Sequence, residues 1–237
     1  MKNTEINTNI KDKNAINASA SDATSEKITK IYFVRHGQSL GNAERIYLGH
    51  TDWDLSELGK EQAQYTATAL KDEKIDVIYS SDLLRAFNTA VPHAKMRNMT
   101  VIPSKNLREV YVGEWEGRKV DEIMVEYQQE FCVEWREHFG TFRCPGGESV
   151  PEVAERIYNE VKRIAEKHTG ETILITSHAA AIRAFWGKIS GIKPEDLAAA
   201  LPFPTNASYS VLYYKDGELV PESYSVDSHM PIVTKIT

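Results

Sequence analysis

Short apolar runs, rich in β-branched and aromatic residues, alternate with longer amphipathic stretches through most of this chain. The apolar runs predict strands at 31–35, 76–79, 100–102 and 171–176. Apolar residues at helical spacing predict helices at about 56–71, 83–94, 149–168 and 179–190. Strands that alternate with helices in this way predict an α/β fold, with a mainly parallel sheet covered by helices on both faces.

Polar residues mark where these elements begin and end. We expect Ser56 to cap the first helix, Ser80-Ser81-Asp82 to cap the second, and Ser149-Val150-Pro151-Glu152 to form a capping box. Pro103 is expected to stop the third strand. On the C-terminal side, strands at 209–214 and 218–221 flank Asp216-Gly217, which predicts an antiparallel hairpin.

Two segments differ from this pattern. Residues 1–29 are rich in Asn, Ser, Thr and Lys and predict a disordered polar tail, which leaves 30–237 as a single domain. Residues 119–142 look helical and carry a stripe of aromatic residues, namely Phe131, Trp135, Phe139 and Phe142. This stripe has two interpretations: it packs in the core, or it forms a helical lid over a site at about 118–145.

Composition narrows the possible partners. The chain has 237 residues and a net charge of −6, which disfavours nucleic acid and anionic membrane surfaces as partners. No apolar run approaches 18 residues, and residues 1–29 lack the apolar core of a secretory signal. Cys132 and Cys144 define no disulfide framework. We therefore expect a cytoplasmic protein, whose oligomeric state the sequence leaves open.

Charged and imidazole side chains follow the ends of the expected strands. Arg35-His36-Gly37 follows the first strand, His178 follows the fourth, and Arg85 lies just beyond the second. In parallel sheets these ends share one edge, where ligands bind. Two imidazoles and two guanidiniums predict a phosphoryl site there, with Gly37 allowing a sharp turn and the helix N-termini after residues 81 and 177 adding N–H donors. Taken singly, each residue also has a purely structural interpretation.

Four motifs in this order resemble the histidine phosphatase superfamily, whose members include phosphoglycerate mutases and several phosphatases. They are Arg35-His36-Gly37-Gln38-Ser39, Ser80-Ser81-Asp82-Leu83-Leu84-Arg85-Ala86, Leu107-Arg108-Glu109 with Gly113-Glu114-Trp115-Glu116-Gly117, and Ser177-His178. The resemblance covers about residues 30–225 and implies a phosphoglycerate mutase-like fold.

By this resemblance, His36 is the nucleophile that becomes phosphohistidine, and Glu109 is the proton donor. Arg35, Arg85 and His178 bind the phosphoryl oxygens, with Asn42 and Gln38 in support. The partner implied is a small phosphorylated substrate. No carboxylate cluster suggests a metal site, and no cofactor is expected. A dehydrogenase is excluded because no G-x-G-x-x-G follows a strand.

The resemblance leaves three outcomes open. The segment between Glu109 and His178 is shorter than in cofactor-dependent mutases, and Pro145-Gly146-Gly147-Glu148-Ser149 looks more like the phosphatase branch. We therefore favour a phosphomonoester hydrolase. The alternatives are phosphoglycerate mutase-type phosphoryl transfer and a non-catalytic pseudoenzyme that binds phosphate or a protein partner.

Overall fold

The computed structural model describes residues 27–231, and most of the predicted polar tail therefore lies outside the described residues. The first strand, β1 (Thr29–Arg35), begins two residues before the expected strand, and the Thr29 side chain is fully buried. The expected boundary between the polar tail and the domain, after residue 29, is thus placed too late, because Thr29 already pairs with Tyr214 in the sheet.

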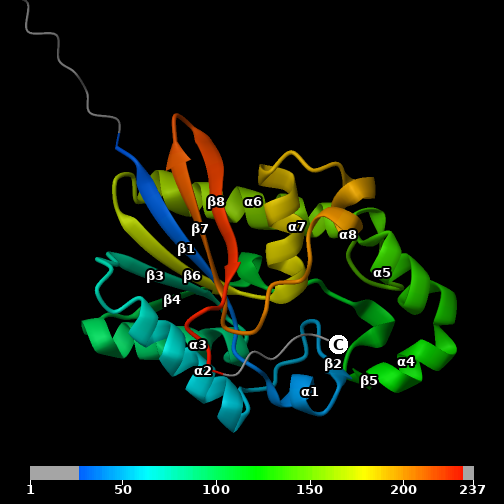
Figure 1. Cartoon of the computed structure of the whole chain (residues 1–237). Helices are drawn as coiled ribbons and strands as arrows, with labels where there is room; N and C mark the ends of the chain where they lie inside the picture. The colour runs from blue at the N-terminus through cyan, green and yellow to red at the C-terminus, as the bar shows by residue number, and fades with distance from the viewer. Residues whose placement is uncertain (1–26, 232–237) are drawn as a thin grey trace, which may run out of the picture.

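A six-stranded sheet runs through the centre of the molecule (Figure 1). Its strands, in spatial order, are β4 (Val101–Ser104), β3 (Val77–Ser81), β6 (Thr172–Ser177), β1, β7 (Tyr209–Lys215) and β8 (Glu218–Val226). The first four are parallel, and β7 and β8 are antiparallel, joined at Asp216-Gly217 with positive φ at both residues. The predicted α/β sheet with its C-terminal hairpin is confirmed.

Helices cover both faces of this sheet, as predicted (Figure 1). Along β1, Ile31 and Phe33 belong to one buried cluster and Tyr32 and Val34 to another, so alternate residues reach opposite faces. Two helices, α6 (Val150–Lys167) and α7 (Ala179–Ile189), pack in the first cluster. The other face is covered by α2 (Glu57–Ala69) and α3 (Leu84–Arg97).

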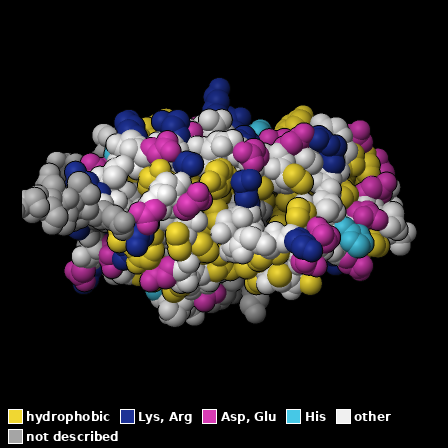
Figure 2. Space-filling model, turned by 90° about the horizontal axis from the view of Figure 1, so that it is seen from above, with side chains coloured by type: hydrophobic (Ala, Val, Ile, Leu, Met, Phe, Trp, Pro, Cys, Tyr) yellow, Lys and Arg dark blue, Asp and Glu magenta, His cyan; other side chains and the backbone are white. Residues whose placement is uncertain are grey.

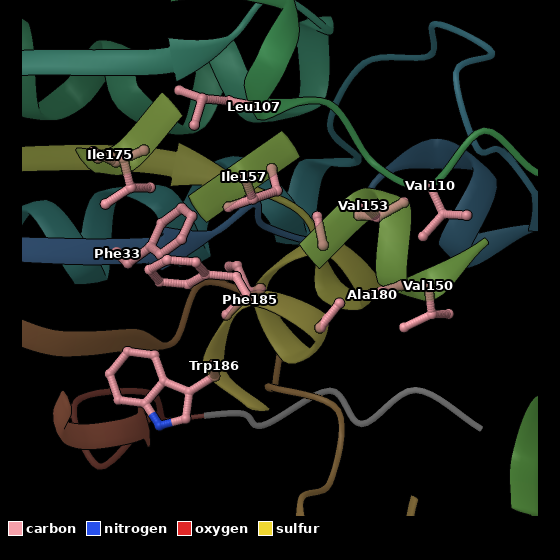
Figure 3. Packing of buried hydrophobic residues seen from close by; sticks show 14 of the residues in the cluster. Phe33, Leu107, Val110, Val150, Val153, Ile157, Ile175, Ala180, Phe185 and Trp186 are labelled. Carbon is pink, nitrogen blue, oxygen red and sulfur yellow. The ribbon is translucent and has the colours of Figure 1, made fainter. Parts of the chain in front are cut away.

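The helix α6 follows its sequence pattern closely. Ser149 and Glu152 form the predicted capping box, and the inner face of the helix is fully buried against the sheet and α7 (Figure 3). That face consists of Val153, Ile157, Val161 and Ile164. The hydrophobic contact of this face with the sheet fixes α6 beside the edge where the parallel strands end.

Two expected element ends are wrong. β3 continues through Ser81, and α3 has Leu83 as its N-cap with no side-chain cap; instead, the carboxylate of Asp52 accepts from the Leu84 amide at 2.7 Å. Pro103 lies inside β4 rather than beyond it. An edge strand that pairs on one side only can hold a proline, and β4 is such a strand.

The segment expected to be helical over 119–142 is broken into short pieces. They are β5 (Arg118–Lys119), paired with β2 (Ile46–Tyr47), then α4 (Val120–Glu126), a π-helix (Glu130–Glu134), α5 (Trp135–Glu137) and a 3₁₀ turn (Phe139–Thr141). All four stripe aromatics are buried. Phe131, Trp135 and Phe142 lie around Trp115, with ring centroids 5.2 to 6.1 Å away. The stripe therefore packs in the core, and the lid interpretation stays a prediction.

The remaining short elements are α1 (Leu40–Ala43), α8 (Leu197–Ala200) and 3₁₀ turns at Lys105–Leu107, Gly113–Trp115 and Pro194–Asp196. Across residues 27–231, no helix is long and apolar enough to cross a membrane. On the face seen in Figure 2, acidic and basic side chains are interspersed and no extended basic surface is visible. Cys132 and Cys144 are free thiols.

His93 of α3 generates a prediction on stability. The ring is fully buried, and neither ring nitrogen has a hydrogen-bond partner among the described residues. Burial, with Arg97 and His229 nearby, lowers the pKa of His93 from 6.5 to about 3. Between these values the unfolded chain binds a proton that the native ring does not, so stability falls as the pH falls, by about 1.4 kcal/mol per pH unit from this group.

We therefore expect His93→Leu to flatten the pH dependence of the free energy of unfolding below pH 6.5. Urea unfolding of the variant and of wild type at pH 5 and pH 7 measures this change. His138→Ala is the matched control, because the His138 ring is exposed. Parallel curves for His93→Leu and wild type would contradict the assignment.

Candidate active site

The four side chains predicted to bind a phosphoryl group lie together at the carboxyl edge of the sheet. β1 and β6 are neighbours, and the amide of His36 donates to the carbonyl of Ser177 at 3.0 Å. The rings of His36 and His178 lie with centroids 5.2 Å apart. Arg35, His36 and Arg85 line one cavity of about 450 Å³. The strand ends thus bring together residues that are far apart in the sequence.

Gly37 is needed for a different reason from the one expected. Its φ does not lie in the left-handed region. Instead, a Cβ at this position would stand 2.4 Å from the carbonyl oxygen of Gly59, and one at Gly59 would stand 1.9 Å from that of Gln38. The two glycines let the first turn of α2 approach the backbone beside His36. The Gly37 amide also donates to Thr89 Oγ1 at 3.0 Å, which ties the loop to α3.

His36 is held in one tautomer. Its Nδ1 lies 2.6 Å from the Gly37 carbonyl, which can only accept, so Nδ1 carries the hydrogen and Nε2 of the neutral ring holds the lone pair. Burial, with the guanidiniums of Arg85 and Arg35, holds the pKa of His36 well below its usual range. A neutral imidazole with a free lone pair is a nucleophile at neutral pH.

Arg35 and Arg85 are buried cations held by main-chain carbonyls. The exposed fraction is 1% for Arg35 and 2% for Arg85. Arg35 Nη1 donates to the Pro204 carbonyl at 2.6 Å, and Arg85 donates to the carbonyls of Gly49 and Thr51 at 2.6 and 2.9 Å.

Within residues 27–231, neither guanidinium forms an ion pair with a carboxylate. Burial lowers the pKa of each to about 10, so both remain charged at neutral pH. Two buried cations that line the same cavity can bind an anion.

His178 is fully buried and serves as the N-cap residue of α7. Its Nε2 lies 2.8 Å from Ser81 Oγ, and its Nδ1 has no hydrogen-bond partner among the described residues. Burial, followed by Arg85 and His36, lowers the pKa of His178 well below its usual range. The ring is therefore neutral, and its Nε2 edge is held by Ser81 at the end of β3.

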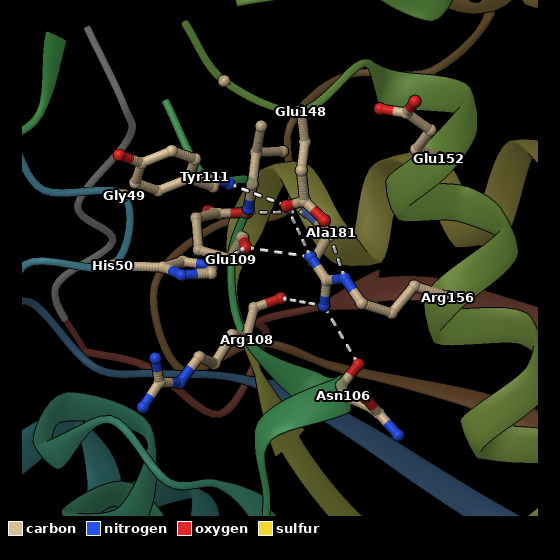
Figure 4. Close-up of polar contacts among 12 residues, drawn as sticks. Gly49, His50, Asn106, Arg108, Glu109, Tyr111, Glu148, Glu152, Arg156 and Ala181 are labelled. Carbon is tan, nitrogen blue, oxygen red and sulfur yellow. Dashed lines mark hydrogen bonds and ion pairs between the residues drawn. The ribbon is translucent and has the colours of Figure 1, made fainter. Parts of the chain in front are cut away.

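Glu109 lies in a loop without regular secondary structure and reaches α7 (Figure 4). Its carboxylate accepts from the amides of Val110, Ala180 and Ala181 at 3.0, 3.1 and 2.8 Å. Side chains thus take some of the N–H donors expected at these helix N-termini: Glu109 binds two amides of α7, and Asp52 binds the Leu84 amide of α3. Glu109 nevertheless lines the cavity.

Gln38 and Asn42 line the cavity but also make structural hydrogen bonds. Gln38 Oε1 accepts from the Ser56 hydroxyl at 2.7 Å. Asn42 Oδ1 accepts from the Ser39 amide at 3.1 Å, in the capping box of α1. For Asn42 this leaves the amide nitrogen as the atom that could reach an anion.

Sequence reasoning missed several residues that line the cavity. Asn206 donates to the His36 carbonyl at 3.2 Å, and Tyr47, Arg136 and Phe203 complete the wall with Phe131 and Trp135. Asn206 and Phe203 lie in a loop whose sequence has no periodic pattern, so no local signal identifies them. Among residues 27–231, no group of three or more His, Cys, Asp or Glu side chains is placed to hold a metal ion.

Comparisons with known proteins agree with this geometry. The family model for the histidine phosphatase superfamily (branch 1) matches residues 31–227. Phosphoserine phosphatase 1 of Hydrogenobacter thermophilus is 34% identical over 204 residues, which is 86% of this chain and 95% of the relative. The 2,3-bisphosphoglycerate-dependent phosphoglycerate mutase of Gloeothece citriformis is 28% identical and spans 72% of this chain and 88% of its own length.

Among solved structures, a mycobacterial glucosyl-3-phosphoglycerate phosphatase in complex with VO3 superposes with a TM-score of 0.77 and 27% identity, over 84% of this chain and 99% of its own. The predicted phosphoglycerate mutase-like fold is thereby confirmed, and the chain belongs to branch 1 of the histidine phosphatase superfamily.

Proposed function

We propose that this chain is a phosphatase that hydrolyses small phosphomonoesters through a phosphohistidine at His36. The observation that carries the proposal is the neutral His36 ring, with Nδ1 bound to the Gly37 carbonyl, between the buried guanidiniums of Arg35 and Arg85. The similarity to a phosphoserine phosphatase and to a glucosyl-3-phosphoglycerate phosphatase supports hydrolysis as the reaction.

In the proposed reaction, the Nε2 lone pair of His36 attacks phosphorus, and the bond to the ester oxygen breaks. Arg35, Arg85 and His178 stabilise the charge on the phosphoryl oxygens. Glu109 gives its proton to the leaving alkoxide. A water molecule then attacks the phosphohistidine and passes a proton to Glu109, so that inorganic phosphate leaves and His36 and protonated Glu109 are restored.

Phosphoglycerate mutase-type transfer is the second candidate, because the chain is also similar to a bisphosphoglycerate-dependent mutase. Both reactions use the same phosphohistidine, and they differ in whether water or a second hydroxyl accepts the phosphoryl group. Incubation with 3-phosphoglycerate separates them, since the phosphatase releases inorganic phosphate and the mutase, primed with 2,3-bisphosphoglycerate, forms 2-phosphoglycerate.

We expect phosphate release from 3-phosphoglycerate in the presence of EDTA, with no 2-phosphoglycerate formed. Rapid quench in alkali should trap a phosphoenzyme that is stable to alkali and labile to acid. His36→Ala should lose roughly 10³-fold or more in kcat because the nucleophile is gone. His138→Ala, at an exposed position, is the control. A fully active His36→Ala enzyme would remove His36 from the mechanism, and a wild type that turns over no phosphomonoester would indicate a pseudoenzyme.

Glu109→Gln tests the proposed acid. The alkoxide of glycerol needs a proton to leave and p-nitrophenolate does not, so the substitution should slow His36 phosphorylation by glycerol 3-phosphate roughly 10²-fold and by p-nitrophenyl phosphate far less. Single-turnover quench-flow measures this step for both substrates. An equal loss for the two would support the structural interpretation, in which Glu109 only anchors its loop to α7.

The charges that line the cavity narrow the substrate class. Among the described residues that line the cavity, Glu109 is the one carboxylate, whereas four are arginines: Arg35, Arg45, Arg85 and Arg136. Arg45 is paired with Asp121 at 2.9 Å, and Arg136, at an exposed position, has no ion-pair partner among the described residues. Since a phosphate dianion balances Arg35 and Arg85, the remaining cation supports a substrate with a second anionic group, such as a carboxylate.

Part of the apolar cavity wall comes from the segment proposed as a lid. Val120, Phe131 and Trp135 line the cavity with Tyr47 and Phe203. This wall supports a lid role for residues 118–145, because apolar walls exclude water while the carbon skeleton of the substrate is bound.

Arg136→Gln should therefore raise KM for 3-phosphoglycerate by about 3- to 10-fold, and leave KM for glycerol 3-phosphate nearly unchanged, because the two substrates differ by one carboxylate. Arg45→Gln should have the smaller effect, since Asp121 already neutralises Arg45. Steady-state kinetics of both variants on both substrates checks these values. If Arg136→Gln raises KM equally for the two substrates, Arg136 does not bind the carboxylate.

A further inference from the structure

Arg156, on the inner side of α6, uses every N–H of its guanidinium on the loop that carries Glu109 and on Glu148 (Figure 4). Its Nη1 donates to the carbonyls of Asn106 and Arg108, both at 3.0 Å, and its Nη2 donates to the Glu109 carbonyl at 3.0 Å. One planar cation thereby fixes three carbonyls of a segment that, at 108–112, forms neither helix nor strand.

Glu148 completes this clamp from the other side of the loop. Its carboxylate accepts from Arg156 Nε and Nη2 at 3.0 and 2.9 Å, and Oε2 also accepts from the Tyr111 amide at 2.8 Å. The Glu148 amide in turn donates to the Tyr111 carbonyl at 2.8 Å. The main chain is therefore held on both sides of Glu109, by Arg156 before it and by Glu148 after it.

The clamp sets where the Glu109 carboxylate can lie. That side chain spans from the clamped loop to the amides of Ala180 and Ala181 in α7, directly beside His178. His50 adds a third support, with Nε2 2.9 Å from the Glu109 carbonyl. A shift of about 1 Å in an acid can cost on the order of 10²-fold in rate, because proton transfer requires hydrogen-bond distance.

We propose that Arg156, together with Glu148, is the positioning residue for Glu109, an inference that rests on the proposed role of Glu109 as proton donor. Lysine keeps the charge but has three donors and no planar fork, so it cannot reach three carbonyls and a carboxylate together. Arg156→Lys should then act as a partial loss of Glu109, with the phosphoryl clamp of Arg35 and Arg85 unchanged.

The test is a double-mutant cycle on the single-turnover phosphorylation of His36 by glycerol 3-phosphate. Arg156→Lys should slow this step about 10- to 100-fold in the wild-type background and less than 2-fold in the Glu109→Gln background, because both changes remove the same proton transfer. With p-nitrophenyl phosphate the loss should be small in both backgrounds. Glu148→Gln, which weakens the same clamp, should follow the same pattern and serves if Arg156→Lys does not fold.

Arg163→Lys is the matched control, since Arg163 lies on the same helix and donates to Glu160 at 2.9 and 2.8 Å. It should leave both rates within about 2-fold. Equal losses from Arg156→Lys in the two Glu109 backgrounds, or equal losses for the two substrates, would overturn the positioning role and leave a structural one. If wild type turns over glycerol 3-phosphate, such equal losses overturn the clamp alone and leave the proposed function standing. If wild type turns over no phosphomonoester, the proposed function fails, and the clamp fails with it.

Discussion

Burying two guanidinium groups beside a neutral imidazole is the constraint on which the site depends. A buried charge is costly unless it is hydrogen-bonded, and Arg35 and Arg85 find their acceptors in the carbonyls of Pro204, Gly49 and Thr51. The loops that supply these carbonyls are therefore shaped by the cations they surround. The same positive field, with burial, keeps the His36 ring uncharged, so one arrangement accounts for both the proposed anion site and the proposed nucleophile.

Much of this arrangement could be predicted because it follows from strand order. Once 31–35 and 171–176 are taken as neighbouring parallel strands, His36 and His178 must share an edge, and the structure places their ring centroids 5.2 Å apart. The bounds and the buried face of α6 could be predicted equally well, because its capping box and its apolar stripe are both local sequence patterns. Predictions of this kind succeed because they use spacing within one element and the rule that parallel strands end together.

Contacts between distant segments could not be predicted. The stripe at 131–142 fits a continuous helix by spacing, yet packing around Trp115 breaks it into a π-helix and short turns. Leu84 takes its cap from Asp52, 32 residues earlier, instead of from the serines beside it. The need for Gly37 comes from the approach of Gly59, which no local turn signal encodes. In each case a tertiary neighbour overrides a local preference.

The N-terminus of α7 couples the two halves of the proposed chemistry. His178 is its N-cap residue, and the next amides, of Ala180 and Ala181, bind the Glu109 carboxylate. A buried strand, β6, sets where this helix begins, so the ring proposed to bind phosphate and the proposed acid are positioned by the same rigid element. Glu109 itself comes from an irregular loop, which is restrained by its contacts with α6, α7, Glu148 and His50. An irregular loop can hold the proposed proton donor beside the proposed phosphoryl site because the hydrogen bonds of Arg156 and of the α7 amides together restrain both its main chain and its carboxylate.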